Sequence, residues 1–153
     1  MIRFEPADVE SGDGQRLEAA MREEMRELYG GLDLRAEGMP KAGREELSPP
    51  GGMFLVGYED ELAVCCGGFK RLSADVCELK RMYVVPQRRG CGIARALLAE
   101  LEERARRFGY SVARLDTGPK QPAARHLYES AGYLPIGNFN ASPVATYFGE
   151  KRL

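Results

Sequence analysis

A strand, a glycine turn and a long helix follow one another between Glu78 and Tyr110, and this unit constrains the fold most strongly. Its sequence reads ELKRMYVVPQRRGCGIARALLAELEERARRFGY. Leucines recur behind the Gly-Cys-Gly turn at helical spacing until Gly109, where a C-terminal cap is expected. A second strand, SVARLD, follows. Because such a helical connection is a crossover, the two strands should be parallel neighbours.

The remaining segments predict a mixed sheet with two further helices. Residues 1–6 read as a strand, and residues 14–31 as an amphipathic helix that ends in a glycine pair. Three strand-like runs in residues 53–84 indicate an antiparallel meander. A helix over residues 121–132 starts at Pro122 and stops at Gly132, with closing strands in 133–137 and 144–153. We therefore predict one α/β domain, residues 1–153.

Composition excludes several classes of protein. The chain has 22 Lys and Arg against 23 Asp and Glu, whereas a nucleic-acid-binding domain is usually basic. No run is apolar enough to span a membrane, and the N-terminus lacks a signal pattern. We expect a cytoplasmic protein that binds neither nucleic acid nor membrane. One histidine and four cysteines without C-x-x-C spacing predict buried thiols and no metal site.

The glycine turn is suited to hold an anion. The first N–H groups of a helix lack intrahelical partners and carry partial positive charge, and glycines let a ligand approach them. Residues 79–99 contain no acidic side chain and five cationic ones: Lys80, Arg81, Arg88, Arg89 and Arg95. A phosphate ligand would be attracted here. The alternative is a solvated basic surface with a purely architectural turn.

Two common phosphate-binding motifs fit poorly. A P-loop ends in Gly-Lys-Ser/Thr, whereas Gly92 is followed by Ile93 and Ala94. A dinucleotide-binding turn requires a small residue where this chain has Arg95, although Asp116 lies near the expected ribose-binding position. An antiparallel meander before the turn also disfavours that fold. A dinucleotide-dependent oxidoreductase therefore ranks below the two functions considered next.

The same residues resemble the GNAT superfamily of N-acetyltransferases. The stretch Gln87–Gly92, QRRGCG, fits the family motif Q/R-x-x-G-x-G/A, which holds the pyrophosphate of acetyl-coenzyme A. AARHLYESAGYLPIG is similar to the next family motif, in which the tyrosine of L-Y-E lies beside the coenzyme's sulfur. The two motifs cover residues 78–137 in the expected order. The resemblance implies a GNAT-like α/β fold, with antiparallel N-terminal strands and a parallel pair that splays into a slot for the pantetheine arm.

The resemblance also implies which residues bind acetyl-coenzyme A. The backbone of Met82, Tyr83 and Val84 would bond the pantetheine arm or the acetyl carbonyl, and the N–H groups of residues 88–92 would hold the pyrophosphate. Many family members have an asparagine where this chain has Gln121, whose amide offers the same donor and acceptor with a longer reach. The full expected set is Met82, Tyr83, Val84, Gln87, Arg88, Arg89, Gly90, Cys91, Gly92, Ile93, Ala94, Gln121 and Tyr128.

Two residues are candidates for the chemistry. Tyr128 matches the family tyrosine that protonates the leaving coenzyme A sulfur; the alternative is a core aromatic residue. Glu78 resembles in position a glutamate that acts as the base in several members; the alternative is a surface carboxylate paired with Lys80 on the same strand face. His126 is expected to face solvent. Cys91 has no histidine or acidic neighbour in sequence, so it is not expected to carry an acyl group.

We therefore predict an acetyl-coenzyme A-dependent N-acetyltransferase that acts on a primary amine by direct attack in a ternary complex. A non-catalytic acyl-coenzyme A sensing module is the alternative, and the presence of both Tyr128 and Glu78 favours the enzyme. The acceptor site would be built from residues 22–52 and 137–147. A small-molecule amine is favoured, while a peptide N-terminus and a lysine side chain stay open. Edge strands also leave a homodimer open.

Overall fold

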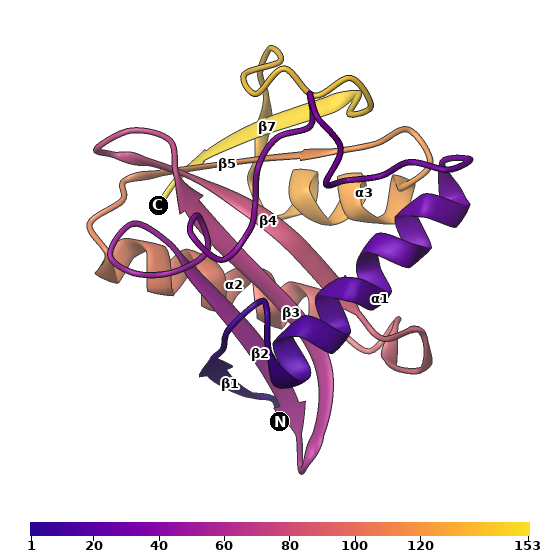
Figure 1. Cartoon of the computed structure of the whole chain (residues 1–153). Helices are drawn as coiled ribbons and strands as arrows, with labels where there is room; N and C mark the ends of the chain where they lie inside the picture. Colours follow the sequence, from indigo (N-terminus) through magenta and orange to yellow (C-terminus); the bar gives the residue numbers. More distant parts are fainter.

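A mixed seven-stranded sheet crosses the molecule between two layers of helices (Figure 1). The computed structural model describes all 153 residues. The helices are α1 (Gly12–Leu28), α2 (Ile93–Arg107) and α3 (Pro122–Ser130), with a 3-10 turn, η1, at Pro86–Arg88. The strands are β1 (Arg3–Pro6), β2 (Met53–Glu59), β3 (Leu62–Arg71), β4 (Val76–Val84), β5 (Val112–Thr117), β6 (Leu134–Pro135) and β7 (Tyr147–Arg152). Their order in the sheet is β1-β2-β3-β4-β5-β7-β6.

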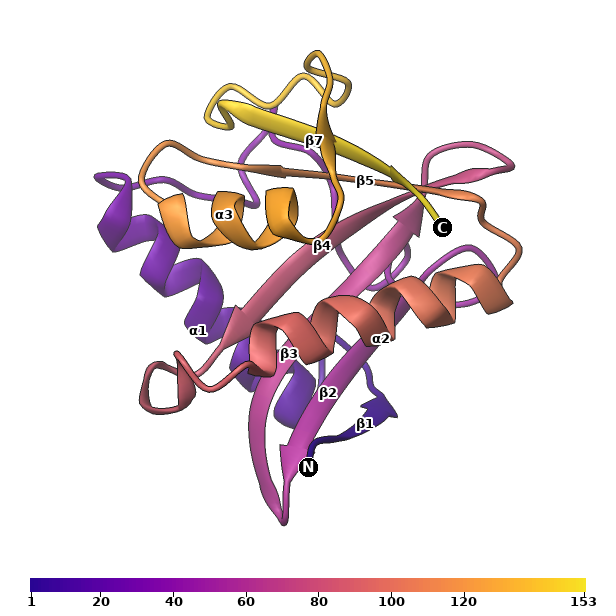
Figure 2. The same cartoon turned by 180° about the vertical axis from the view of Figure 1, so that it is seen from behind.

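Helix α1 covers one face of the sheet, and α2 and α3 cover the other (Figure 2). The leucine stripe predicted for α2 is buried, because Leu97, Leu98 and Leu101 pack in the same apolar cluster as Phe69 and Leu79 of the sheet. On α1, apolar residues at helical spacing are likewise buried: Leu17, Met21 and Met25. The sequence-based element order and the mixed sheet are confirmed.

Strands β4 and β5 form the parallel pair that the crossover predicts, but they pair over a short stretch only. Their register joins Val76 to Val112, Cys77 to Ala113 and Glu78 to Arg114. Beyond Glu78, β4 continues along β3, while β5 continues along β7. The two strands therefore diverge, as both cartoons show (Figure 1, Figure 2), and a cavity occupies the slot between them. The predicted splay is confirmed.

A β-bulge interrupts β4 at the point where the slot opens. The register with β3 shifts between Cys66 and Gly68, so that an extra residue of β4 lies opposite β3, and Arg81 adopts a left-handed φ of 61°. Side chains normally alternate between the faces of a strand. Because of the bulge, the consecutive residues Lys80 and Arg81 both line one cavity on the α1 face.

Several boundaries differ from those that the sequence predicts. Helix α2 begins at Ile93, because Gly92 before it has a left-handed φ of 83°. The closing strands are shorter than expected, with β6 limited to two residues and β7 starting at Tyr147. The hydroxyl of Ser142 accepts hydrogen bonds from the N–H groups of Val144 and Ala145, so the first residues of the predicted closing strand belong to a turn instead.

The loop between α1 and β2 packs against the sheet without forming a helix. Ala42 and Leu47 are buried in an apolar cluster with Phe54 and Val56 of β2. The sequence did not indicate that these two residues are buried, because the segment as a whole is polar. They hold the loop on the same face of the sheet as α1 (Figure 1).

The cysteines divide into two groups. Cys65, Cys66 and Cys77 are buried, as expected, and burial raises the pKa of Cys65 and of Cys77 to about 12. The expectation was wrong for Cys91, which is exposed. It lies in the glycine turn, where no core covers it.

Candidate active site

A cavity of about 730 Å³ occupies the slot between the diverging strands. Its walls come from β4, the glycine turn, the start of α3 and the inner face of α1. Eleven of the expected coenzyme-binding residues line it: Met82, Tyr83, Val84, Arg88, Arg89, Gly90, Gly92, Ile93, Ala94, Gln121 and Tyr128. Gln87 and Cys91 are exposed and do not line this cavity.

The glycine turn presents a row of free backbone N–H groups. The N–H of Arg88 donates to the carbonyl of Val85 at 3.0 Å, and that of Arg89 to the carbonyl of Pro86 at 3.4 Å, so these two groups are already engaged. The successive N–H groups from Gly90 to Arg95 have no acceptor in the protein. They therefore form the better anion site, at the positive end of α2.

The arginine side chains beside the turn are held by acidic residues. Arg88 pairs with Glu59 at 2.6 Å, and Arg89 pairs with Glu24 of α1 at 2.8 Å. Arg89 also donates from Nε to the carbonyl of Val84 at 2.9 Å. These contacts fix the two side chains around the slot, so their charge contributes to its potential while the backbone groups remain available to a ligand.

Replacing Gly90 by valine should weaken coenzyme binding about tenfold or more, since a β-branched residue is strained at the φ of 78° found here and would crowd the N–H row. Calorimetric titration with coenzyme A measures the change. Gly109→Val is the matched control, because Gly109 has a φ of 96° and open space around it at the far end of α2. Unchanged affinity of the Gly90 variant would remove the anion site from this turn.

Tyr128 lies where the slot meets a second cavity. Its side chain is buried in the main apolar cluster, and its hydroxyl lies 3.8 Å from the sulfur of Met82, its sole hydrogen-bond partner in the protein. Burial raises the pKa of Tyr128 above its usual range, and the charge of Asp116 adds to the shift. The residue is thus both a core aromatic and a protonated hydroxyl that points toward the cavities.

Gln121 is oriented by a residue that the sequence does not single out. Its Oε1 accepts hydrogen bonds from the hydroxyl of Tyr29 at 3.1 Å and from the N–H of Gly118 at 3.3 Å. The Tyr29 hydroxyl in turn accepts from the N–H of Lys120 at 3.1 Å. The amide NH₂ of Gln121 is left to donate to a ligand in the slot. Tyr29 lies 92 residues from Gln121, so no local pattern could have linked them.

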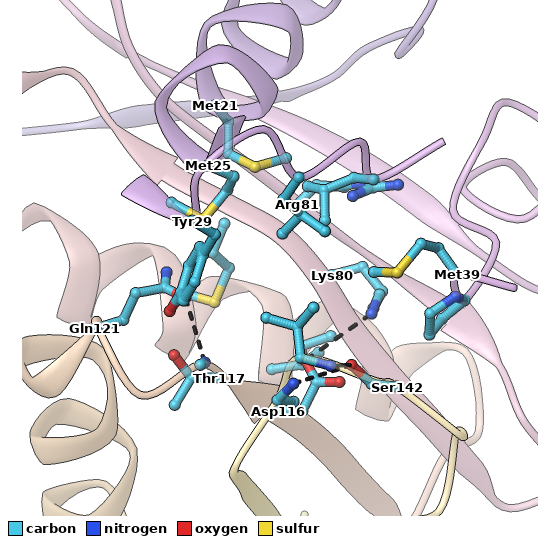
Figure 3. A pocket seen from close by; sticks show the side chains of 18 of the residues that line it. Met21, Met25, Tyr29, Met39, Lys80, Arg81, Asp116, Thr117, Gln121 and Ser142 are labelled. Carbon is cyan, nitrogen blue, oxygen red and sulfur yellow. Dashed lines mark hydrogen bonds and ion pairs between the residues drawn. The ribbon is translucent and has the colours of Figure 1, made fainter. Parts of the chain in front are cut away.

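The second cavity, of about 130 Å³, lies on the α1 side of the diverging strands (Figure 3). It shares five lining residues with the slot: Met21, Met25, Met82, Gln121 and Tyr128. Apolar residues of α1 and of the following loop form one wall, among them Leu32, Leu34 and Met39. The junction of the two cavities is therefore the place where two ligands could meet.

Charged side chains from β4 and β5 form the floor of the second cavity. Asn140 donates to Glu78 Oε2 at 2.8 Å and to Asp116 Oδ2 at 2.7 Å. Lys80 Nζ lies 3.3 Å from Glu78 and 4.0 Å from Asp116. Asp116, Lys80 and Thr117 line the cavity, whereas Glu78 lies behind them, fully buried and with Oε1 unpaired.

Glu78 thus pairs with Lys80 as the alternative interpretation expected, but it is not a surface carboxylate. Asn140, 62 residues away, was missed because only the closing loop brings it to the floor. His126 is exposed, as predicted. No cluster of three or more His, Cys, Asp or Glu side chains is arranged to hold a metal ion. None of the helices is both long and apolar enough to cross a bilayer.

Known proteins share this fold and these motifs. The acetyltransferase (GNAT) family matches residues 16–133. An IAA acetyltransferase from Azospirillum brasilense is 34% identical over 113 residues, which cover 71% of this chain and 73% of the relative. A crystal structure assigned as an acyl-CoA N-acyltransferase from Klebsiella pneumoniae has a TM-score of 0.79 and 29% identity, and covers 100% of this chain and 98% of the other.

A further similar structure is the PaiA N-acetyltransferase from Thermoplasma acidophilum in complex with coenzyme A. It has a TM-score of 0.73 at 18% identity and covers 100% of this chain and 99% of its own, so it supports the fold alone. Taken with the splayed strands, these similarities identify an acyltransferase. Because the family match spans most of the sequence, the chain belongs to the GNAT acetyltransferase family.

Proposed function

We propose that the protein transfers the acetyl group of acetyl-coenzyme A to the primary amine of a small molecule. The observation that carries this proposal is the junction at Tyr128, where the slot meets a second, smaller cavity. The slot fits a coenzyme A thioester, since free N–H groups at one end suit a pyrophosphate and the unpaired edge of β4 suits pantetheine amides. The thioester supplies an activated acetyl group.

The chain's own residues position and assist the transfer. The Gln121 amide donates to the pantetheine arm, and the edge of β4 aligns that arm with the junction. The Tyr128 hydroxyl donates to the sulfur as negative charge develops there. Because both ligands are held at once, the amine attacks the thioester directly within a ternary complex.

The amine must lose a proton before or during its attack. Alkylamines have a pKa of roughly 10, so they are mostly protonated at neutral pH. Glu78 and Asp116 both accept a hydrogen bond from Asn140, and both lie near the ammonium group of Lys80. Only Asp116 of the two lines the second cavity, which we call the acceptor cavity because it would hold the amine. We assign the base role to Glu78, which receives the proton through water or through this carboxylate pair.

Calorimetric titration with acetyl-coenzyme A, compared with NAD, tests the first half of the proposal, and an amine panel with detection of free coenzyme A tests the second. We expect saturable binding of acetyl-coenzyme A without NAD binding, followed by turnover with small amines. Tight binding without turnover of any amine would favour a sensing module instead. Binding of NAD alone would contradict the assignment of the slot.

A further inference from the structure

Arg81 is a buried arginine whose guanidinium makes no hydrogen bond within the protein. Only 7% of its side chain is exposed, and its Nε is fully enclosed without an acceptor. The nearest carboxylate oxygen, Glu18 Oε2, lies 3.6 Å from Nε, which is too far for a hydrogen bond. A guanidinium has five N–H donors, and buried donors in folded proteins are nearly always paired. Arg81 lines the second cavity and also a third cavity of about 480 Å³, which Glu18 and Arg35 line as well, and its enclosed, unpaired Nε indicates that a hydrogen-bond acceptor is missing beside it.

Glu18 is the acidic group nearest to Arg81, but two other arginines share its carboxylate. Arg22 Nε donates to both oxygens of Glu18, at 2.8 and 3.0 Å, and Arg35 lies 3.5 Å away. Three guanidinium groups thus share one carboxylate. Burial lowers the pKa of Arg81, and Arg22 and Arg35 add to this effect while Glu18 opposes it. An anion beside Arg81 would reduce this accumulated positive charge.

The other end of the cavity floor has the opposite character. There two carboxylates, Glu78 and Asp116, face a single ammonium group, that of Lys80. Glu78 Oε1 and Thr117 Oγ1 are buried without a partner and can accept hydrogen bonds. One end of the floor therefore attracts an ammonium group and the other an anion. This pattern complements a zwitterion.

The bulge in β4 places the anion-attracting end beside the reaction centre. Arg81 follows Lys80 on the same face, and the next residue, Met82, contacts the Tyr128 hydroxyl. Figure 3 shows Arg81 and Lys80 on the side of the cavity where Met39 lies, away from Gln121. The cavity volume of about 130 Å³ is small beside the 730 Å³ of the slot, which suits a small acceptor. Its wall from α1 and the loop is apolar.

We propose that Arg81 binds the carboxylate of the acceptor, which is a free amino acid with an apolar side chain. Its amine then lies toward Asp116 and Glu78, and its side chain against Leu32, Leu34 and Met39. A planar guanidinium pairs with a carboxylate through two parallel hydrogen bonds, so Arg81 fixes the orientation of the amine as well as supplying affinity. This inference rests on the proposed function, since it names the substrate class of the same site.

Matched acceptors test the carboxylate directly. Leucine, methionine and phenylalanine are each compared with their amides and with the amines that lack the carboxyl group, and kcat/KM is measured for each. We expect the best free acid to exceed its amide by about tenfold or more. In Arg81→Gln this preference should vanish, while the rate with the amide changes little. Equal rates for acids and amides in the unaltered protein would overturn the proposal.

Two further variants separate recognition from folding. Arg81→Gln keeps a residue with a side chain at the φ of 61°, and Arg81→Lys keeps the charge with fewer directed hydrogen bonds, so the lysine variant should retain an intermediate preference. Arg16→Gln is the control, because Arg16 is exposed on α1 and lines neither the slot nor the second cavity. A loss of the acid preference in this control as large as in Arg81→Gln would contradict a specific role.

Binding without transfer distinguishes this inference from the proposed function. The same amino acids are titrated calorimetrically into the protein saturated with coenzyme A. Binding that requires the carboxylate and disappears in Arg81→Gln, without acetylation of any amine, would support the carboxylate site while the transferase proposal fails. Acetylation of amides and plain amines as readily as acids would leave the transferase proposal standing and remove the role of Arg81.

Discussion

Tyr128→Phe should lower kcat by about 100-fold while leaving the affinity for coenzyme A nearly unchanged. The hydroxyl lies at the junction of the two cavities, and burial raises its pKa, so it stays protonated at neutral pH and can donate to the sulfur. Folding stability should change little, since the hydroxyl contacts only the Met82 sulfur, at 3.8 Å. Steady-state kinetics, calorimetry and thermal unfolding together measure these three effects.

The matched control for this variant is Tyr147→Phe. Tyr147 is also a buried tyrosine, but its hydroxyl donates to the backbone carbonyl of Tyr133 at 3.4 Å, and the residue lines neither the slot nor the second cavity. The Tyr147→Phe variant should therefore lose some folding stability and keep the kcat of the unaltered enzyme. If Tyr128→Phe turned over as fast as the unaltered enzyme, the donor role would have to pass to water or to another side chain.

Glu78→Gln should lower kcat/KM by about 100-fold at neutral pH. The change keeps the shape of the side chain and its bond with Asn140 while removing the negative charge beside Lys80. As the pH approaches the pKa of the acceptor amine, more of the amine is neutral before it binds. The difference in kcat/KM between Glu78→Gln and the unaltered enzyme should therefore shrink as the pH rises. A pH profile of kcat/KM from neutral to alkaline pH measures this change.

The isosteric control is Glu150→Gln. Glu150 pairs with Arg114 at 2.8 Å on the neighbouring strands and lies outside the cavities, so its loss should leave the pH profile unaltered. A defect of Glu78→Gln that stayed constant across pH would indicate that Glu78 positions Asn140 and Lys80 without accepting the proton.

Much of the fold could be predicted because its signals are local. The leucine stripe of α2, the glycines around its N-terminus and the meander before it are periodic or short-range patterns, and they determined the element order and the parallel pairing of β4 with β5. Tyr128 was identified in the same way, from a short motif on one helix. The weakest predictions were the closing strands, where the Ser142 hydroxyl accepts from the N–H groups of Val144 and Ala145 and so delays the start of β7.

The sequence predicted an acceptor site in residues 22–52 and 137–147, and both segments line the second cavity, but the contacts within that cavity could not be predicted because they join distant residues. Asn140 reaches Glu78 over 62 residues and Asp116 over 24, and Tyr29 reaches Gln121 over 92. The sequence alone predicted the residues of β4, the glycine turn and α3 that line the slot, because they lie in two short motifs, but it did not predict those of α1. Tertiary structure decided which charges meet in the acceptor cavity, because a single bulge in β4 turns Arg81 onto the same face as Lys80, and local periodicity does not encode that bulge.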